Sequence, residues 1–346
     1  MSVQQDPVEV EPGQSYEIDL FKPEDAPGIT RLFRSVYGEE YPAKHVYDPA
    51  SIRRLFESGD NYPVVARTVG GDIVGHTALF RNAPNRCLYE SGAGLVLPSY
   101  RNRGINSALM RYAFEDAALR DRADMEALWG EPVCSHLHMQ KTTSRLGLVE
   151  MGLEADLLPS EAYGRERGTP GRTCALPGFR IYRSNPHPVY VPKAYRVHLA
   201  FLYSALDDCR RFLLSTEPLP RSCRTEPRTE FLESTRVARV DLAAAGEDLD
   251  ESMAALEAKL SPKEPAVIQV RLSLGLPWVG RGVDVLRERG YFLGGVLPGW
   301  FEDDGLLLQK TAGSPAWDSI RLYTDRARAI RDMVRADWVE TGRSTS

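Results

Sequence analysis

The chain has 346 residues, 42% of them hydrophobic and 26% charged, and it carries a formal net charge of −5. This length is too great for one typical domain and suits two, and the composition is that of a soluble globular protein. The acidic balance argues against a general nucleic-acid or membrane-surface binder, which would need a basic face, although it leaves room for a local basic pocket.

The cysteines and the first residues bear on the cellular setting. The five cysteines are Cys87, Cys134, Cys174, Cys209 and Cys223. Their number is odd and no pair has CxxC spacing, which argues against a disulfide framework or a structural zinc site and favours a reducing cytosol. We expect residues 1–15 to be a disordered lead-in rather than a signal peptide, because they are acidic and lack an apolar core. No apolar run reaches the roughly 20 residues that span a bilayer. We therefore expect a cytoplasmic protein.

Residues 16–162 alternate between strand and helix patterns and predict one domain. In chain order the patterns predict a strand at 16–21, helices at 22–38 and 48–59, a hairpin at 62–81, a glycine-interrupted strand at 87–98, a helix from 105, a strand at 125–138, a helix at 139–147 and a strand at 148–159. This order combines an antiparallel start with parallel crossovers. It predicts an α/β fold with a mixed sheet and helices on both faces.

The remaining chain predicts a second, related domain. Residues 163–192 are rich in Gly, Pro and Arg and predict a linker. A second domain is expected at 193–320, followed by a C-terminal helix and tail at 321–346. The segments "SRLGLVEMGLEADLLP" and "RERGYFLGGVLPGWF" form a weak repeat. Each leaves a helix near an Arg-x-Gly and passes through a glycine-containing apolar strand to Leu-Pro, which indicates two tandem halves.

The segment "LVLPSYRNRGINSALM" places a basic, glycine-containing turn between a strand and a helix. Gly104 permits close backbone approach, and the following helix exposes unpaired N–H groups and the positive end of its dipole. Arg101 and Arg103 add positive charge, and Ser107 adds a hydroxyl. Together these groups would hold two linked phosphates. The alternative interpretation is an ordinary basic helix start that packs against a sheet.

The strand before this turn consists of Leu95, Val96 and Leu97 and ends at Pro98. A proline at a strand end leaves backbone pairing incomplete nearby. Free carbonyl and N–H groups there could pair with an extended ligand that contains amides, much as an added strand would. Pantetheine is such a ligand.

This stretch resembles the acyl-CoA motif of the GNAT acetyltransferase superfamily, which reads Arg/Gln-x-x-Gly-x-Gly/Ala at a strand-to-helix turn. Here the motif reads Arg101, Asn102, Arg103, Gly104, Ile105 and Asn106. Asn106 stands where the family has glycine or alanine, and its bulk could crowd a phosphate. The resemblance covers residues 16–160. It implies a GNAT-like fold that binds acetyl-CoA, with a degenerate second copy that has no counterpart of this motif.

The resemblance also suggests a general base, whereas the usual acid is missing. Glu90 resembles the position at which many GNAT enzymes place a glutamate base; the alternative is a solvent-facing or hairpin-pairing glutamate. GNAT enzymes often use a tyrosine as general acid, four residues before a Gly-Phe pair. Counting back from Gly147 and Leu148 leads to Thr143, which cannot replace a phenol as an acid.

The segment "CSHLHMQK" offers substitutes for the missing acid. On a strand, Cys134, His136 and His138 would point to one face. We therefore consider His136 and His138 as residues that shuttle a proton near neutral pH. Three alternatives stay open: a metal site, a Cys134 nucleophile activated by a histidine, and core or cleft-lining residues with satisfied hydrogen bonds.

Together these features predict an N-acetyltransferase that moves an acetyl group from acetyl-CoA to an amine by direct transfer, without a metal. The acceptor would be a small-molecule amine or a peptide amine, with no nucleic-acid or membrane partner. One alternative is a non-catalytic acyl-CoA-binding sensor or scaffold, and a further one is a metal-dependent enzyme. A tandem fold suits a monomer, because one chain then supplies the contact that single-domain relatives obtain by dimerising; a homodimer is the alternative.

Overall fold

The computed structural model describes residues 10–121, 124–159, 171–206 and 210–344. The chain divides into two compact units, one made of residues 1–82 and 86–128, the other of residues 83–85 and 129–346. The fold is a mixture of helices with antiparallel and parallel strands, which confirms the predicted α/β class. No helix among the described ranges is long and apolar enough to cross a membrane.

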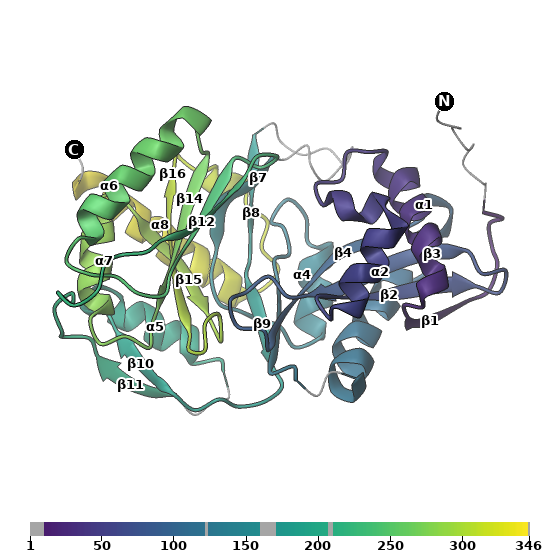
Figure 1. Cartoon of the computed structure of the whole chain (residues 1–346), viewed down its shortest axis with the longest axis horizontal. Coiled ribbons are helices and arrows are strands. Elements are labelled where there is room, and N and C mark those ends of the chain that lie inside the picture. Colours follow the sequence, from purple (N-terminus) through teal and green to yellow (C-terminus); the bar gives the residue numbers. More distant parts are fainter. Residues whose placement is uncertain (1–9, 122–123, 160–170, 207–209, 345–346) are drawn as a thin grey trace. The chain divides into compact units, whose positions relative to one another are not determined.

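The first unit contains the elements that the sequence predicted for its part of the chain (Figure 1). They are β1 (Tyr16–Leu20), η1 (Pro23–Asp25), α1 (Ala26–Tyr37), η2 (Lys44–Tyr47), α2 (Pro49–Glu57), β2 (Asn61–Thr68), β3 (Ile73–Phe80), β4 (Leu88–Val96), η3 (Pro98–Tyr100), α3 (Ile105–Arg111) and the π-helical η4 (Tyr112–Asp121). The chain passes into the second unit along β5 (Ala127–Gly130).

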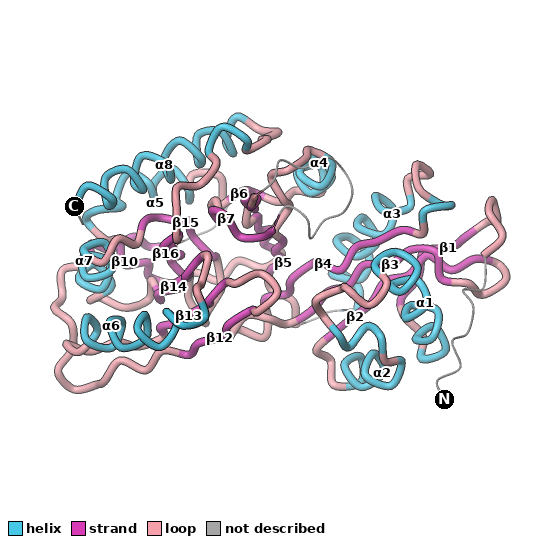
Figure 2. The backbone as a smooth tube through the Cα atoms, turned by 90° about the horizontal axis from the view of Figure 1, so that it is seen from above, coloured by secondary structure: helices cyan, strands magenta, loops and turns pink. Residues whose placement is uncertain are grey.

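Strands β1 to β4 form an antiparallel sheet in chain order, with helices on both of its faces (Figure 2). Neighbouring residues of β3 show the two faces, because successive side chains of a strand point to opposite sides. A Cβ on Gly75 would touch Ile105 of α3, whereas His76 contacts Phe33 of α1. The α1 face carries a buried apolar cluster that includes Phe33 and Leu95. This face and the end of β4 form the setting of the predicted site.

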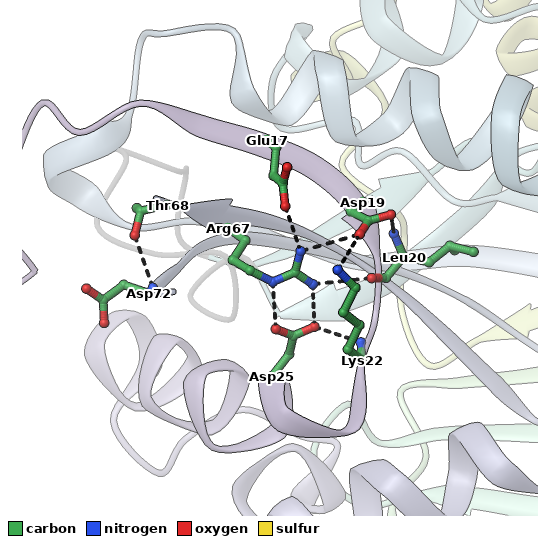
Figure 3. A network of polar contacts seen from close by, with 8 residues as sticks. All are labelled: Glu17, Asp19, Leu20, Lys22, Asp25, Arg67, Thr68 and Asp72. Carbon is green, nitrogen blue, oxygen red and sulfur yellow. Dashed lines mark hydrogen bonds and ion pairs between the residues drawn. The ribbon is translucent and has the colours of Figure 1, made fainter. Parts of the chain in front are cut away.

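A buried ion-pair network joins β1, β2 and the start of α1 (Figure 3). Arg67 donates two hydrogen bonds to Asp25, of 2.8 and 2.6 Å, and its side chain is 11% exposed against 3% for Asp25. Arg67 also reaches Glu17 at 3.2 Å and Asp19 at 3.4 Å. The hydrogen bond with Asp25 raises the pKa of Arg67 above its already high ordinary value, so the guanidinium stays charged.

Replacing Arg67 by methionine should destabilise the first unit by about 3 kcal/mol, because Asp25 would keep a buried charge without its partner. The measurement is native-state hydrogen exchange of the amides of β1–β3. Arg54→Met is the matched control, since Arg54 is 67% exposed and pairs with Asp48 at 3.5 Å. This control should change stability by less than about 0.5 kcal/mol. Equal protection in the two variants would contradict a stabilising role for the network.

The second unit is built around a five-stranded sheet and three smaller pairings. Its elements are α4 (His138–Arg145), β6 (Val149–Glu150), β7 (Glu154–Pro159), β8 (Arg172–Ala175), β9 (Gly178–Ile181), β10 (Pro188–Val191), η6 (Lys193–Tyr195), α5 (Arg196–Tyr203), β11 (Arg211–Leu214), β12 (Arg228–Leu232), β13 (Val237–Leu242), α6 (Leu249–Leu260), η7 (Ser261–Lys263), β14 (Val267–Ser273), α7 (Val279–Glu288), β15 (Phe292–Leu297), β16 (Gly305–Thr311), η8 (Trp317–Ser319) and α8 (Asp325–Ser344). The large sheet has the order β12-β13-β14-β16-β15, in which β13 and β14 are parallel and the other neighbours antiparallel. Figure 2 shows α8 on one side of this sheet and α6 on the other.

Two stretches differ from the sequence prediction. The strand expected at 125–138 ends at Gly130, because Pro132 has no N–H group to continue a ladder, and the chain then turns into α4. The described part of the expected linker 163–192 contains β8, β9 and β10, with Phe179 and Val189 buried. Its glycines and prolines lie between short strands. Composition alone does not distinguish such a series of short strands from a linker.

The two sequence repeats end their helices in the same way. Helix α4 is followed by Gly147 with φ 78° and helix α7 by Gly290 with φ 83°. The residue after each glycine donates a 3.0 Å hydrogen bond to a carbonyl in the last turn of its helix, that of Thr143 or Leu286. A left-handed residue at this position suits glycine, which has no Cβ to clash. The repeat read from the sequence is therefore also a repeat of backbone geometry.

The segments after these two glycines pair with each other. Gly152 and Gly295 hold equivalent places in the two repeats and form an isolated antiparallel bridge. Two backbone hydrogen bonds, of 2.7 and 2.9 Å, flank the bridge, from Leu153 to Gly294 and from Val296 to Met151. Exchanging the two repeats converts one bond into the other, as in a contact about a two-fold axis. A Cβ on either glycine would overlap the backbone of the opposite segment, so glycine is required at both positions.

Candidate functional site

The turn between β4 and α3 is held by backbone bonds and by one buried tyrosine. The amide of Leu97 donates to the carbonyl of Val74 at 2.9 Å, which ties the end of β4 to β3. The amide of Tyr100 donates to the carbonyl of Leu97 at 2.8 Å, and its hydroxyl donates to the carbonyl of Glu11 at 2.6 Å. Tyr100 is fully buried. The base of the turn is therefore fixed, whereas residues 101–104 above it are exposed.

Gly104 makes the strand-to-helix turn possible. It is the N-cap of α3, with φ 75° and ψ 5°, and no side chain caps the helix there. This left-handed conformation strongly favours glycine, because a Cβ would meet the following carbonyl. Apart from its neighbours in the chain, no described residue has an atom within 4 Å of the place where a Cβ on Gly104 would stand. The start of α3 therefore presents N–H groups and the positive end of the dipole to open space, as an anion would require.

The two arginines of the turn point to different surroundings. Arg101 donates from Nε to the carbonyl of Val96 at 3.3 Å, and its charge lies close enough to Tyr37 of α1 to oppose the rise that burial causes in that tyrosine's pKa. Arg103 lies over the ring of Tyr100, with 5.4 Å from its guanidinium carbon to the ring centre. Both side chains are exposed. The structure thus keeps two exposed positive charges just before Gly104 in the chain.

Asn106 does not fill the turn. Its side-chain oxygen lies 3.6 Å from the place where a Cβ on Gly94 would stand, so the amide leans back over β4. The half-buried side chain leaves the space at Gly104 open. Ile105 is buried under the same helix start and Ser107 is exposed. The crowding expected from asparagine at this motif position is therefore avoided by its direction.

Strand β4 carries a bulge that the sequence analysis did not predict. Opposite β3, Leu95 pairs with His76 and Gly92 with Ala78, so Ala93 and Gly94 together face Thr77. Ala93 has φ 54°, the left-handed conformation that alanine rarely adopts. Two residues opposite one define a β-bulge. The two glycines that interrupt this strand were the available signal, because glycine inside a strand often marks such a site.

Glu90 lies on β4 before the bulge and is half-buried. Its partner across the sheet is Phe80 of β3. One carboxylate oxygen accepts a 2.8 Å hydrogen bond from the side-chain amide of Asn82. The carboxylate is therefore oriented by a neighbour while it keeps contact with the surface, as a base that exchanges protons with solvent or substrate requires.

His136 and His138 lie in the second unit, not on a strand. His136 follows a turn and His138 begins α4, with 5.5 Å between the centres of their rings. The shared-face argument for Cys134, His136 and His138 is therefore wrong, because the backbone there is not extended. Burial raises the pKa of the Cys134 thiol, which works against the thiolate that a nucleophile needs. Over the described ranges, no three His, Cys, Asp or Glu side chains group as a metal ion would require.

Thr143 occupies the place of the expected tyrosine. Its hydroxyl donates back to the carbonyl of Met139 in its own helix, at 2.9 Å. The side chain is buried and lines a small pocket together with Gln140, Ser144 and Glu150. A hydroxyl used within the helix cannot protonate a leaving thiolate, so the geometry adds no substitute acid here.

The second unit has no open basic turn at the position that corresponds to the β4–α3 turn of the first unit. Its parallel strands β13 and β14 pair without interruption from Val237–Val267 to Leu242–Leu272. Helix α6, which joins them, has Asp250 and Glu251 in its first turn. Carboxylates at a helix start would repel a diphosphate. Continuous pairing also leaves no free backbone groups for an added ligand strand along β13.

Comparison with protein families gives a match to part of the first half of the chain. Residues 26–135 match the family model of the acetyltransferase (GNAT) family. The matched segment contains α1, the β4 bulge and the turn at Gly104. This segment is therefore similar to a GNAT acetyltransferase domain.

Among solved structures, the ribosomal-protein-S5-alanine acetyltransferase of Vibrio fischeri is 14% identical with a TM-score of 0.38, covering 50% of this chain and 94% of that one. The dodecameric spermidine N-acetyltransferase of Vibrio cholerae is 12% identical with a TM-score of 0.38, covering 48% and 93%. Scores this low add nothing to the family match. No curated protein matches the sequence.

Proposed function

We propose that this protein is an N-acetyltransferase that transfers an acetyl group from acetyl-CoA to an amine. The observation that carries the proposal is the open, glycine-capped start of α3 within the segment that matches the GNAT family. The diphosphate of the cofactor would lie against the residues from Arg101 to Ser107, and pantetheine would run along Leu95–Leu97. A cytoplasmic location stays a prediction of the sequence.

The chemistry requires a base for the amine and a proton for the thiolate that leaves. Glu90 would remove the proton from the attacking amine, directly or through water. The nitrogen then forms its bond to the acetyl carbon as the carbon–sulfur bond breaks, and the sulfur takes up a proton. His136 and His138 stay candidates for moving that proton. The acceptor would be a small-molecule amine or a peptide amine.

The second half would be a degenerate copy of the same fold. The order β13-α6-β14-α7-β15-β16 repeats β4-α3-β5-α4-β6-β9, with the hairpin β7–β8 inserted before β9. Both β6–β9 and β15–β16 are antiparallel. The symmetric bridge between Gly152 and Gly295 supports a monomer, because one chain supplies both sides of a two-fold contact. The sequence predicts limits of 16–162 and 193–320 for the two copies; because β9 belongs to the repeated order, we propose that the first copy extends to Ile181.

The test of the cofactor site is calorimetric titration of the purified protein with acetyl-CoA, dephospho-CoA and pantetheine. We expect roughly micromolar binding of acetyl-CoA, retained binding of dephospho-CoA, which keeps the diphosphate, and loss of binding for pantetheine, which lacks it. Arg103→Ala should weaken binding roughly tenfold. Gly104→Val should abolish it, because valine does not adopt the left-handed conformation.

Arg111→Ala is the matched control, since Arg111 is an exposed arginine in the last turn of the same helix. It should leave the affinity unchanged. Equal weakening by Arg111→Ala and Arg103→Ala would mean that only the general charge of the helix matters. No binding of acetyl-CoA by the unmodified protein would make the turn an ordinary basic helix start.

The second candidate function is a non-catalytic acyl-CoA-binding protein. The hydroxyl of Thr143, bonded within its own helix, favours this function, because the usual acid is absent. Such a protein would bind acetyl-CoA in the titration above and acetylate none of a panel of polyamines, aminoglycosides and lysine peptides.

A further inference from the structure

The β4 bulge decides which way the residues of the proposed site face. His76 and Phe80 lie on the same face of β3, four positions apart, and His76 contacts Phe33 of α1. Glu90 stands opposite Phe80, so it shares this α1 face. Leu95 stands opposite His76 and belongs to the same apolar cluster as Phe33. The proposed base and the start of the proposed cofactor strand therefore lie on one face.

An uninterrupted strand would not allow this arrangement. Glu90 and Leu95 are an odd number of residues apart, and successive side chains of a strand alternate between faces. Regular pairing would thus place them on opposite sides of the sheet. The extra residue at Ala93–Gly94 shifts the alternation by one and brings both to the α1 side. Any group that stabilises the bulge also stabilises the relative placement of Glu90 and Leu95.

Two side chains of β3 form hydrogen bonds with carbonyl groups of the bulge. The imidazole Nδ1 of His76 lies 2.9 Å from the carbonyl oxygen of Ala93, and the hydroxyl of Thr77 donates to the carbonyl of Gly92 at 3.2 Å. A carbonyl only accepts, so the proton of the first bond is on Nδ1. Burial lowers the pKa of His76 to about 4, although the bond to Ala93 opposes this. His76 is therefore neutral at pH 7 and fixed as the Nδ1–H tautomer.

We propose that His76 is a positioning residue for acetyl transfer: its Nδ1–H group holds the carbonyl of Ala93 and thereby keeps the bulge that sets Glu90 and Leu95 on one face. The inference rests on the proposed function. His76 does not act on the substrate. It is 3% exposed and packed against Phe33. Its role is to give the carbonyl of Ala93 a hydrogen bond in place of regular strand pairing, as Thr77 does for the carbonyl of Gly92.

The test compares His76→Asn with His76→Leu, two side chains of the same shape. Asparagine offers an N–H donor near the position of Nδ1, and leucine offers none. We expect the leucine variant to lose roughly tenfold or more in kcat, with the Kd for acetyl-CoA changed by less than about threefold. The asparagine variant should keep most of kcat. A folding defect alone would not separate two variants of matched stability in this way.

A second measurement follows the bond itself. Nitrogen-15 spectra of the imidazole should show the Nδ1–H tautomer in the unmodified protein from pH 6 to 8, and the Nε2–H form or a mixture would overturn the proposal.

If His76→Leu does not fold, Thr77→Val tests the same bulge through the carbonyl of Gly92. Equal kcat values for the asparagine and leucine variants would overturn the positioning role while leaving the enzyme intact. Acetyl-CoA binding without any turnover in the unmodified protein would instead overturn the proposed function, and with it any catalytic role of the bulge.

Discussion

Replacing Glu90 by glutamine should lower kcat by roughly 10² to 10⁴-fold while the affinity for acetyl-CoA stays unchanged. Glutamine keeps the shape of the side chain and can still accept the 2.8 Å bond from Asn82, but it cannot take a proton from an amine. The measurement is steady-state acetylation of the best amine from a screen, together with calorimetric titration of acetyl-CoA. A loss confined to kcat would identify an interaction of the chemical step.

Glu57→Gln is the matched control, because Glu57 is an exposed glutamate on α2 of the same unit. It should leave both the rate and the affinity as they are. A fully active Glu90→Gln variant would show that another group, or water alone, removes the proton. The pH dependence of kcat/KM should also lose its acidic limb in the Glu90→Gln variant if this carboxylate is the base.

Replacing Asp304 by asparagine should destabilise the second unit by about 3–5 kcal/mol. Asp304 is completely buried and accepts hydrogen bonds from the hydroxyl of Tyr203 at 2.6 Å, from the amide of Gly299 at 2.8 Å and from two nitrogens of Arg210. Removing its charge takes a buried carboxylate away from the guanidinium of Arg210, which is 4% exposed. All five tryptophans lie in this unit, so urea unfolding followed by tryptophan fluorescence reports on it.

Asp318→Asn is the control for this prediction, because the side chain of Asp318 is 94% exposed and pairs with Arg335 at 3.4 Å. It should shift stability by less than about 0.5 kcal/mol. Similar urea midpoints for the two variants would contradict a central role of Asp304.

The same site predicts a pH dependence. Burial alone would raise the pKa of Asp304, but the 3.4 Å ion pair with His187 and the hydrogen bonds from Arg210 lower it well below the ordinary value. Its stabilisation is therefore present above the ordinary pKa of aspartate, about 4, and is lost in stronger acid. The bond with Asp304 raises the pKa of His187, so that contribution is complete below about 6.5 and is lost as pH rises through the raised value. Both contributions are complete between these limits, so Asp304→Asn should reduce the loss of stability that the unmodified protein shows on either side of them.

The local features of the proposed site could be predicted because their partners are near in sequence. Asp48 caps α2 through the amides of Ala50 and Ser51, at 3.0 and 3.1 Å. Gly104 and Gly147 adopt the left-handed conformation that their places at helix ends require. Patterns of caps, glycines and apolar spacing are sufficient for such elements, since the interactions that stabilise them span a few residues.

The segment from Cys134 to His138 shows why other features could not be predicted. Its alternation suits a strand as well as a turn. In the structure the amide of Cys134 donates to the carbonyl of Cys174 at 2.8 Å, and its own carbonyl accepts from Arg321 at 2.9 Å. Those partners lie far along the chain, and no local sequence pattern predicts them. Tertiary contacts of this kind override local preference.

The sequence by itself determined the α/β class, the position of the basic turn after β4 and the repeat that links the two halves, because each rests on local conformation and on apolar periodicity. Only the tertiary structure decided that Ala93 bulges, that His76 holds its carbonyl and that Glu90 and Leu95 share a face. Strand register depends on which residues meet across the sheet, and one extra residue reverses every side chain beyond it. The placement of the proposed base against the proposed cofactor strand is therefore a property of the pairing of β3 with β4.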